Sequence, residues 1–190
     1  MGRGNSIRII GGRFRGRRLG FPSATGLRPT ADRLRETLFN WLQGELEGAR
    51  CLDLFAGSGA LGFEALSRGA AWLTAVDAAP AVARRLNENL RRLGVESQAE
   101  VVRADAFRFL ARPPRTPFDL VFLDPPYAMR RLPELCRRLE EGGWLGSQAW
   151  IYIEQDAARP WPEPPVGWRL HREAQAGQAA CRLLHRANMA

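Results

Sequence analysis

The sequence predicts an α/β fold, in which a doubly wound, mostly parallel sheet of seven strands contains an antiparallel strand and follows a small N-terminal β-hairpin and helix. Three observations predict it. The chain has 190 residues, enough for one domain with a small appendage. From residue 50 onward, short apolar runs alternate with helical patterns, as in βαβ units. Near the C-terminus, two strand-like runs follow each other with no helix between them, which favours an antiparallel pair.

The first elements belong to the N-terminal extension. Residues 7–21 indicate two short strands around a hairpin turn at Gly11-Gly12, and 22–29 indicate a loop. Thr30 is the expected N-cap of a helix of about a dozen residues. The apolar positions of this helix recur at helical spacing, at Leu34, Leu38, Trp41 and Leu42.

The remaining elements alternate along the chain. Strands are predicted at 51–55, 72–77, 100–105, 118–124 and 149–154. Helices are predicted at 60–68, 80–93 and 132–141, each stopped by a glycine or opened by a proline. The last two strands, near 167–173 and 179–186, meet at Gly177.

Charge is distributed unevenly between the two predicted parts of the chain, an extension at 1–29 and a main domain at 30–190. Residues 1–35 hold nine arginines and one acid, a net of +8, whereas residues 36–190 hold nineteen of each and are neutral. Clustered arginines contact phosphates and release counterions, so a basic head on a neutral body predicts a nucleic-acid partner.

Several classes of protein are not expected. No apolar run approaches the roughly 20 residues that cross a bilayer, and the N-terminus has no apolar signal core, so neither membrane insertion nor secretion is predicted and a cytoplasmic location fits best. The cysteines and histidines lack the spacing of a disulfide framework or a metal site; they are Cys51, Cys136, Cys181, His171 and His185.

A glycine-rich loop, Asp53-Leu-Phe-Ala-Gly57-Ser-Gly59-Ala-Leu-Gly62, follows the first strand of the main domain and opens a helix. Its spacing also fits a dinucleotide fingerprint, so an NAD oxidoreductase is a rival hypothesis. A carboxylate at Asp53 would repel a pyrophosphate but attract the ammonium and sulfonium of S-adenosylmethionine. Asp53 therefore favours the methyl donor, although it is also compatible with a simple cap of the loop.

Two more acids end the next two strands. Asp77 suits the two hydroxyls of a ribose, with either cofactor. Asp105 suits an adenine amino group, with the N–H of Ala106 beside it, and Asp105 alone fits a helix N-cap equally well. Because successive parallel strands end at one edge, all three acids are predicted to line one crevice.

The loop Asp124-Pro125-Pro126-Tyr127 follows the fourth strand of the main domain. Asp124 and the carbonyl of Pro125 can accept from an exocyclic –NH₂ group, and Tyr127 can stack on a planar base. The pattern predicts amino-group methylation without a covalent enzyme intermediate. A turn with a capping aspartate and a packing tyrosine is the alternative interpretation.

These motifs make the chain resemble the bacterial 16S ribosomal RNA (guanine(966)-N2)-methyltransferase family, which has a Rossmann-like class I methyltransferase fold. The resemblance covers nearly the whole chain. Besides the two loops above, it is carried by Ile7 to Arg17, Gly26 to Trp41, Glu64 to Arg68, His171 to Glu173 and Gly177-Gln178. One departure is Ala79, where related sequences usually carry a second acid.

The resemblance implies methyl transfer from S-adenosylmethionine to the N2 amino group of a guanine in 16S ribosomal RNA, either free or within the small subunit. The implied catalytic residues are Asp124, Pro125 and Tyr127. The implied cofactor-binding residues are Asp53, Phe55, Gly57, Gly59, Asp77, Asp105 and Ala106. The implied RNA-binding residues are Arg13, Arg15, Arg17, Arg18 and Arg28. No metal is implied, and a monomer is expected.

Alternatives remain at this point. The same chemistry also suits a DNA adenine or a protein glutamine, although no separate DNA-recognition domain is visible and the basic head does not suit a peptide. A non-enzymatic RNA-binding module is the third hypothesis. The role of Arg130 and Arg131, directly after the proline-rich loop, stays open between RNA contact and the start of a helix.

Overall fold

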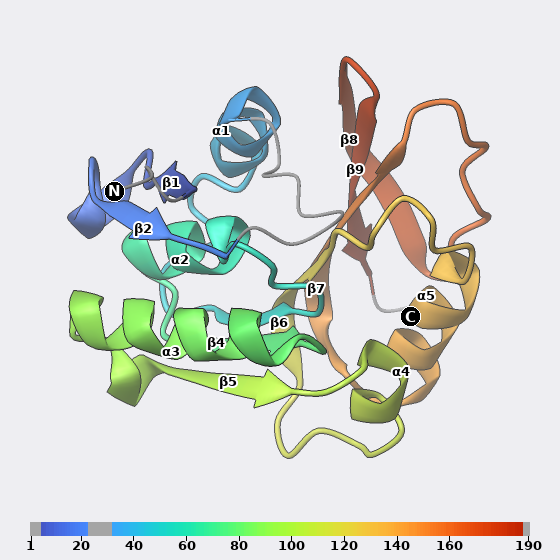
Figure 1. Cartoon of the computed structure of the whole chain (residues 1–190). Coiled ribbons are helices and arrows are strands. Elements are labelled where there is room, and N and C mark those ends of the chain that lie inside the picture. The colour runs from blue at the N-terminus through green and yellow to red at the C-terminus, as the bar shows by residue number, and fades with distance from the viewer. Residues whose placement is uncertain (1–4, 23–31, 188–190) are drawn as a thin grey trace.

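The computed structural model describes residues 5–22 and 32–187, and its centre is one sheet of seven strands (Figure 1). The strand order is β5-β4-β3-β6-β7-β9-β8. β3 to β7 pair in parallel, and β9 is antiparallel to both β7 and β8, which confirms the predicted sheet. The strands are β3 (Arg50–Asp53), β4 (Trp72–Asp77), β5 (Ala99–Arg103), β6 (Phe118–Leu123), β7 (Leu145–Asp156), β8 (Trp168–Ala176) and β9 (Ala179–Arg186).

The strand order reverses direction between β3 and β6. The chain first builds outward from β3 to β4 and β5, then crosses back to place β6 on the other side of β3. In open parallel sheets, ligands bind outside the carboxyl ends of the strands at such a switch point. This rule makes the ends of β3 and β6, next to Asp53 and Asp124, the candidate position of a binding site.

The helices agree with the sequence in all the long elements. The predicted helices appear as α2 (Ala60–Ser67), α3 (Pro80–Leu93) and α5 (Leu132–Glu141), and the helix of the extension as α1 (Asp32–Trp41). Its expected cap, Thr30, lies outside the described residues. Three short elements were not predicted: α4 (Ala106–Phe109) and the 3₁₀ turns η1 (Gly12–Phe14) and η2 (Glu96–Gln98). None of the helices described is long and apolar enough to cross a bilayer.

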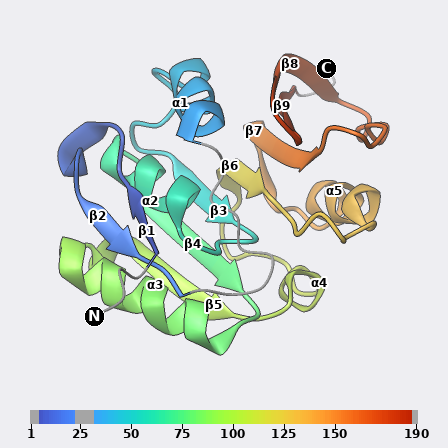
Figure 2. The same cartoon turned by 45° about the horizontal axis from the view of Figure 1, so that its top comes forward.

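Two apolar cores cover the two faces of the sheet (Figure 2). One core joins the sheet to α1, α2, α3 and the N-terminal hairpin, and it contains the fully buried Phe39 and Phe122. The other joins the sheet to α4 and α5, through Phe107, Leu135 and Leu139. Covering both faces explains why the central strands are apolar throughout rather than alternating.

The N-terminal hairpin has the two predicted strands but not the predicted turn. β1 (Ser6–Arg8) pairs antiparallel with β2 (Arg18–Gly20). They are joined not by a two-residue turn at Gly11-Gly12 but by residues 9–17, which include η1. The reason is a contact with α2, because the carboxylate of Glu64 takes up backbone N–H groups that a tight turn would have used.

Glu64 holds the hairpin on α2. Its two carboxylate oxygens accept from the N–H groups of Ile10 at 2.8 Å and Gly11 at 2.7 Å, and Oε1 also accepts from Nε of Arg68 at 2.8 Å. One turn further along, the Ser67 hydroxyl donates to the carbonyl of Gly11. The hairpin thus shares an apolar core and several hydrogen bonds with the main domain. The division of the chain into two domains at residue 29 stays a prediction.

Candidate active site

Four acids meet at the carboxyl edge of the sheet, as the topology requires. Asp53 and Asp77 are the last residues of β3 and β4, Asp105 follows β5, and Asp124 follows β6. These strands are consecutive in the order β5-β4-β3-β6. The register pairs Asp53 with Phe122, so Asp124 lies just beyond it on the neighbouring strand.

Asp53 is the most constrained of the four. Its side chain is buried, and Oδ2 accepts from the N–H of Gly62 at 3.2 Å. Among the described residues, Oδ1 has no hydrogen-bond partner although it is inaccessible to solvent. Burial raises the pKa of the Asp53 carboxyl to about 7; the nearby charge of Asp77 adds to this, and the backbone N–H groups of Gly62 and Phe55 have a smaller opposing effect. A buried carboxylate oxygen without a partner is suited to a cationic ligand.

The glycine loop brings the backbone close to this carboxylate. Gly59, the N-cap of α2, has φ +79°, and a Cβ there would lie 2.3 Å from the ring of Phe63. A Cβ on Gly62 would meet the side chain of Leu73 at 2.8 Å. Glycine is therefore required at Gly59, whose φ is positive, and favoured at Gly62, because a Cβ at either position would press on core side chains.

Asp77 fastens two loops at the carboxyl edge. Oδ2 accepts from the N–H of Gly57 at 3.0 Å, and Oδ1 accepts from the N–H of Ala79 at 2.8 Å. Each carboxylate oxygen has a further lone pair, so the side chain can still accept from two hydroxyls. The missing acid at Ala79 does not leave this loop unsupported, because the backbone of Ala79 itself bonds to Asp77.

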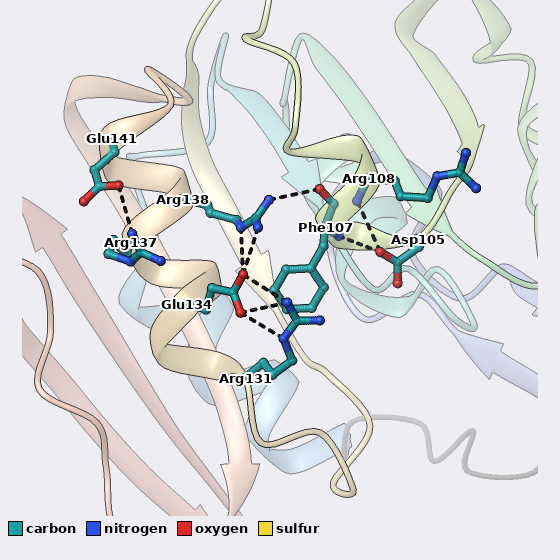
Figure 3. Close-up of polar contacts among 8 residues, drawn as sticks. All are labelled: Asp105, Phe107, Arg108, Arg131, Glu134, Arg137, Arg138 and Glu141. Carbon is teal, nitrogen blue, oxygen red and sulfur yellow. Dashed lines mark hydrogen bonds and ion pairs between the residues drawn. The ribbon is translucent and has the colours of Figure 1, made fainter.

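Asp105 is the N-cap of α4, which was one of its two predicted roles. Oδ1 accepts from the N–H groups of Phe107 at 2.9 Å and Arg108 at 3.2 Å. Figure 3 shows the second carboxylate oxygen turned away from the helix. The N–H of Ala106, the first residue of α4, takes no part in this cap. A cap and a ligand contact are therefore compatible at Asp105.

Arg131 joins α5 to α4 and has a structural role. Its guanidinium lies 3.7 Å from the centre of the Phe107 ring and pairs with Glu134 at 2.8 Å, and Glu134 also pairs with Arg138 (Figure 3). Of the two hypotheses for Arg131, the structure favours the start of a helix. Arg130 is exposed beside the proline-rich loop.

The loop from Asp124 to Tyr127 is fixed at both ends. Pro125 is buried, Tyr127 is half-buried against the core that contains Phe122, and the N–H of Met129 donates to the carbonyl of Pro126 at 2.7 Å. The prolines and this turn limit how far the loop can move. The loop is thus a rigid corner at the switch point.

Behind this corner is a buried polar pair that the sequence reasoning missed. The hydroxyl of Tyr152 donates to Oε2 of Glu154 at 2.9 Å, and both side chains are buried. Burial raises the pKa of both groups. The available signal was a tyrosine and a glutamate two residues apart on one predicted strand, which places them on the same face.

The predicted RNA-binding arginines lie away from the acids. Arg13, Arg15, Arg17 and Arg18 are exposed on the hairpin. A side-chain nitrogen of Arg13 donates to Gln98, which directly precedes β5, so this part of the hairpin lies at the amino end of the sheet. The structure therefore does not bring these arginines to the carboxyl edge. Arg28 lies outside the described residues. Within the described ranges, no cluster of His, Cys, Asp and Glu could hold a metal ion.

Two solved structures that are similar to this chain are named as methyltransferases or methylases. A putative methyltransferase from Escherichia coli is 50% identical, with a TM-score of 0.88, covering 96% of this chain and 99% of that one. A putative methylase from Haemophilus influenzae is 41% identical, with a TM-score of 0.82, covering 97% of this chain and 100% of that one. The fold and these two similar structures thus define a methyltransferase with the class I fold.

The family follows from the sequence matches. The family model described as "Conserved hypothetical protein 95" matches residues 7–185. "Ribosomal RNA small subunit methyltransferase D" of Escherichia coli K12 is 51% identical over 180 residues, covering 95% of this chain and 90% of the relative. The protein of that name from Haemophilus influenzae is 44% identical, covering 93% and 92%. The chain belongs to this family of bacterial methyltransferases.

The residues present fit S-adenosylmethionine. The unpartnered Oδ1 of Asp53 suits the positive charge of the cofactor, and the positive φ angles of Gly57 and Gly59 give the loop a backbone that a ligand can approach closely. Asp77, with free lone pairs on both oxygens, suits a ribose. The NAD hypothesis is wrong, since family and fold are those of methyltransferases.

Proposed function

We propose that this protein methylates the exocyclic N2 amino group of a guanine in 16S ribosomal RNA, at a site of the guanine(966) type. The relatives named above as acting on small-subunit ribosomal RNA support the substrate class. The position of Asp124 beside Asp53 across the β3–β6 pair supports the chemistry, and it is the observation that carries the proposal.

At the cofactor side, S-adenosylmethionine supplies a methyl group on a positively charged sulfur. In this proposal Asp53 faces the cationic methionine part, Asp77 accepts from the ribose hydroxyls, and Asp105 with the N–H of Ala106 contacts the adenine. Gly57, Gly59 and the backbone at Phe55 form the surface on which the cofactor lies. The structure supports these roles by the cap geometry of Asp105 and the open lone pairs of Asp77.

At the substrate side, Asp124 and the carbonyl of Pro125 accept the two N–H bonds of the guanine amino group. This draws the nitrogen lone pair out of conjugation with the ring and directs it at the methyl group. Tyr127 stacks on the base and fixes its plane. The rigid corner holds the amino group in line, so the rate gain comes from positioning and electrostatics.

The basic hairpin is the proposed RNA-contacting surface, through Arg13, Arg15, Arg17 and Arg18, with Arg28 in the adjoining segment. Because the hairpin lies toward the amino end of the sheet, RNA that also reaches Asp124 must extend over roughly one strand length, about 17–20 Å. A folded RNA within the small subunit or an assembly intermediate fits such a span. We propose that the enzyme acts there as a cytoplasmic monomer.

Asp124→Ala tests the chemistry. We expect methylation of 16S ribosomal RNA to fall at least 10³-fold while affinity for S-adenosylhomocysteine, measured by calorimetry, changes less than threefold. Glu141→Ala, which removes an exposed carboxylate of α5, is the matched control and should keep full activity. Retained methylation by Asp124→Ala would refute its role.

The substrate is tested by mapping. Ribosomal RNA from a strain that lacks the gene should miss one N2-methylguanine, located by primer extension and mass spectrometry, and purified enzyme should restore it on small subunits. Parallel assays on DNA and on release factor test the adenine and glutamine alternatives. Methylation of either in place of RNA would overturn the proposal.

A further inference from the structure

A cavity of about 310 Å³ adjoins the proline-rich corner on the side of α5 and the β7–β8 loop. The corner contributes Pro125, Pro126 and Tyr127 to its wall, and the loop that follows contributes Met129. The start of α5 contributes Leu132, and the loop after β7 contributes Arg159 and Trp161. None of the cofactor residues lines it. Its volume is at the lower end of the range of about 300–1,000 Å³ that small-molecule sites occupy, so one planar group fits and a folded segment does not.

Trp161 forms a supported aromatic wall. The guanidinium of Arg182 from β9 lies 4.6 Å from the centre of the indole, and Arg182 is held in turn by Glu173 of β8 at 3.0 Å. The Arg182 guanidinium lies over the ring of Trp161, and the Trp161 side chain is only half-buried. An indole held in this way presents a flat apolar surface without further reorganisation.

Other parts of the wall are also held by hydrogen bonds. Nη1 of Arg159 donates to the carbonyl of Met129 at 2.8 Å, which ties the β7–β8 loop to the loop that follows Tyr127. Nε2 of Gln155 donates to the carbonyls of Arg159 at 3.1 Å and Pro160 at 3.4 Å. The cavity is therefore built from hydrogen-bonded segments rather than from loose side chains.

We propose that this cavity is a subsite for one unpaired nucleobase of the RNA substrate, adjacent in the strand to the base that is methylated. The inference rests on the proposed function. Pro125 and Tyr127, which the proposed function assigns to the target base, also line the cavity, so the cavity lies directly beside the target position and a neighbouring nucleotide is within its reach.

Chemistry favours a nucleotide as the occupant. Trp161, Met129 and five prolines provide apolar and flat walls that suit the face of a base; the prolines are Pro125, Pro126, Pro133, Pro160 and Pro162. Arg130 and Arg159 bring positive charge for the attached phosphate, against the single acid Asp156. An aromatic platform with an arginine beside it is the combination that single-stranded RNA sites use.

Trp161→Ala tests the subsite on small ribosomal subunits prepared from a strain that lacks the enzyme. We expect the KM for subunits to rise about tenfold, the scale of one base–aromatic stacking contact, with kcat and the KM for S-adenosylmethionine changed less than twofold. Trp161→Phe should restore most of the affinity. Leu170→Ala, which removes an exposed apolar side chain from β8, is the control and should match the wild type.

Chemical probing of bases in the enzyme–subunit complex supplies a readout independent of activity. The wild type should protect one base next to the target guanine, and Trp161→Ala should leave that base reactive. The subsite is refuted, while the proposed function stands, if Trp161→Ala and Leu170→Ala have the same KM. It is refuted equally if the wild type and Trp161→Ala protect the same bases. If the wild type methylates no ribosomal RNA, the proposed function is refuted and the subsite with it.

Discussion

Replacing Asp53 by asparagine removes the negative charge from the buried end of β3 and keeps the shape of the side chain. The pKa of this carboxyl is raised by burial, so the folded protein holds its proton more tightly than the unfolded chain does. The folded state therefore loses stability as the pH rises from about 4 to about 7, the window between the two pKa values. Above that window the loss is complete and constant.

The size of the effect follows from the two values. A shift from 3.8 to about 7 corresponds to about 4 kcal/mol of unfolding free energy lost across the window. The side-chain amide in the variant cannot ionise and has no such loss, although burying it costs about 1–3 kcal/mol at every pH. Asp53→Asn should thus be less stable than the wild type at pH 4 and more stable at pH 8, with a relative change of about 4 kcal/mol.

Urea unfolding of the cofactor-free wild type and of Asp53→Asn, measured at intervals between pH 4 and pH 8, gives this difference directly. Asp119→Asn, a change at an exposed carboxylate, serves as the control and should show little relative change. The same Asp53→Asn protein should bind S-adenosylhomocysteine at least tenfold more weakly, because a charge-assisted contact is lost. A stability difference that does not vary with pH would refute the reasoning about Asp53.

Two further variants test the N-terminal hairpin. Glu64→Gln removes the buried charge that three donors share. We expect it to lower the free energy of unfolding in urea by about 2–3 kcal/mol and to speed proteolysis of the hairpin. Glu88→Gln, at an exposed side chain of α3, is the control, and equal stability of the two variants would contradict the role of Glu64. Arg17→Ala should weaken binding to 16S ribosomal RNA and reduce the slope of log affinity against log salt by about 0.7–0.9, whereas exposed Arg137→Ala should leave the slope unchanged. An unchanged slope for Arg17→Ala would remove this residue from the RNA surface.

The carboxyl edge could be predicted because it depends on local patterns and one topological rule. The apolar runs around Cys51, Leu73 and Val121 can be recognised as strands from their local sequence alone. Parallel pairing of these strands then brings together the acids that follow them. The glycine positions follow from the same logic, since Gly59 adopts a conformation that other residues rarely tolerate. These features need no knowledge of distant contacts.

The parts that could not be predicted depend on contacts between distant residues. The turn of the hairpin was misplaced because Glu64, more than fifty positions away in the chain, takes up the N–H groups of Ile10 and Gly11. The role proposed for Trp161 could not be predicted either, because nothing local in the sequence connects this residue with Arg182 or with the proline-rich corner. Such contacts follow from the assembled fold and leave no local pattern.

Helix α2 connects the glycine loop with the N-terminal hairpin, the two regions to which the proposed function assigns cofactor and RNA. This eight-residue helix is about 12 Å long and follows its N-cap Gly59. Glu64 in its middle and Ser67 at its C-terminal end bind the backbone of the hairpin. In the proposed function, α2 fixes the distance between the arginines of the hairpin and the glycine loop that would hold the methyl donor. An RNA that contacts the hairpin but carries its guanine at another spacing would then not reach the donor, so this distance would contribute to selectivity besides the identity of the base.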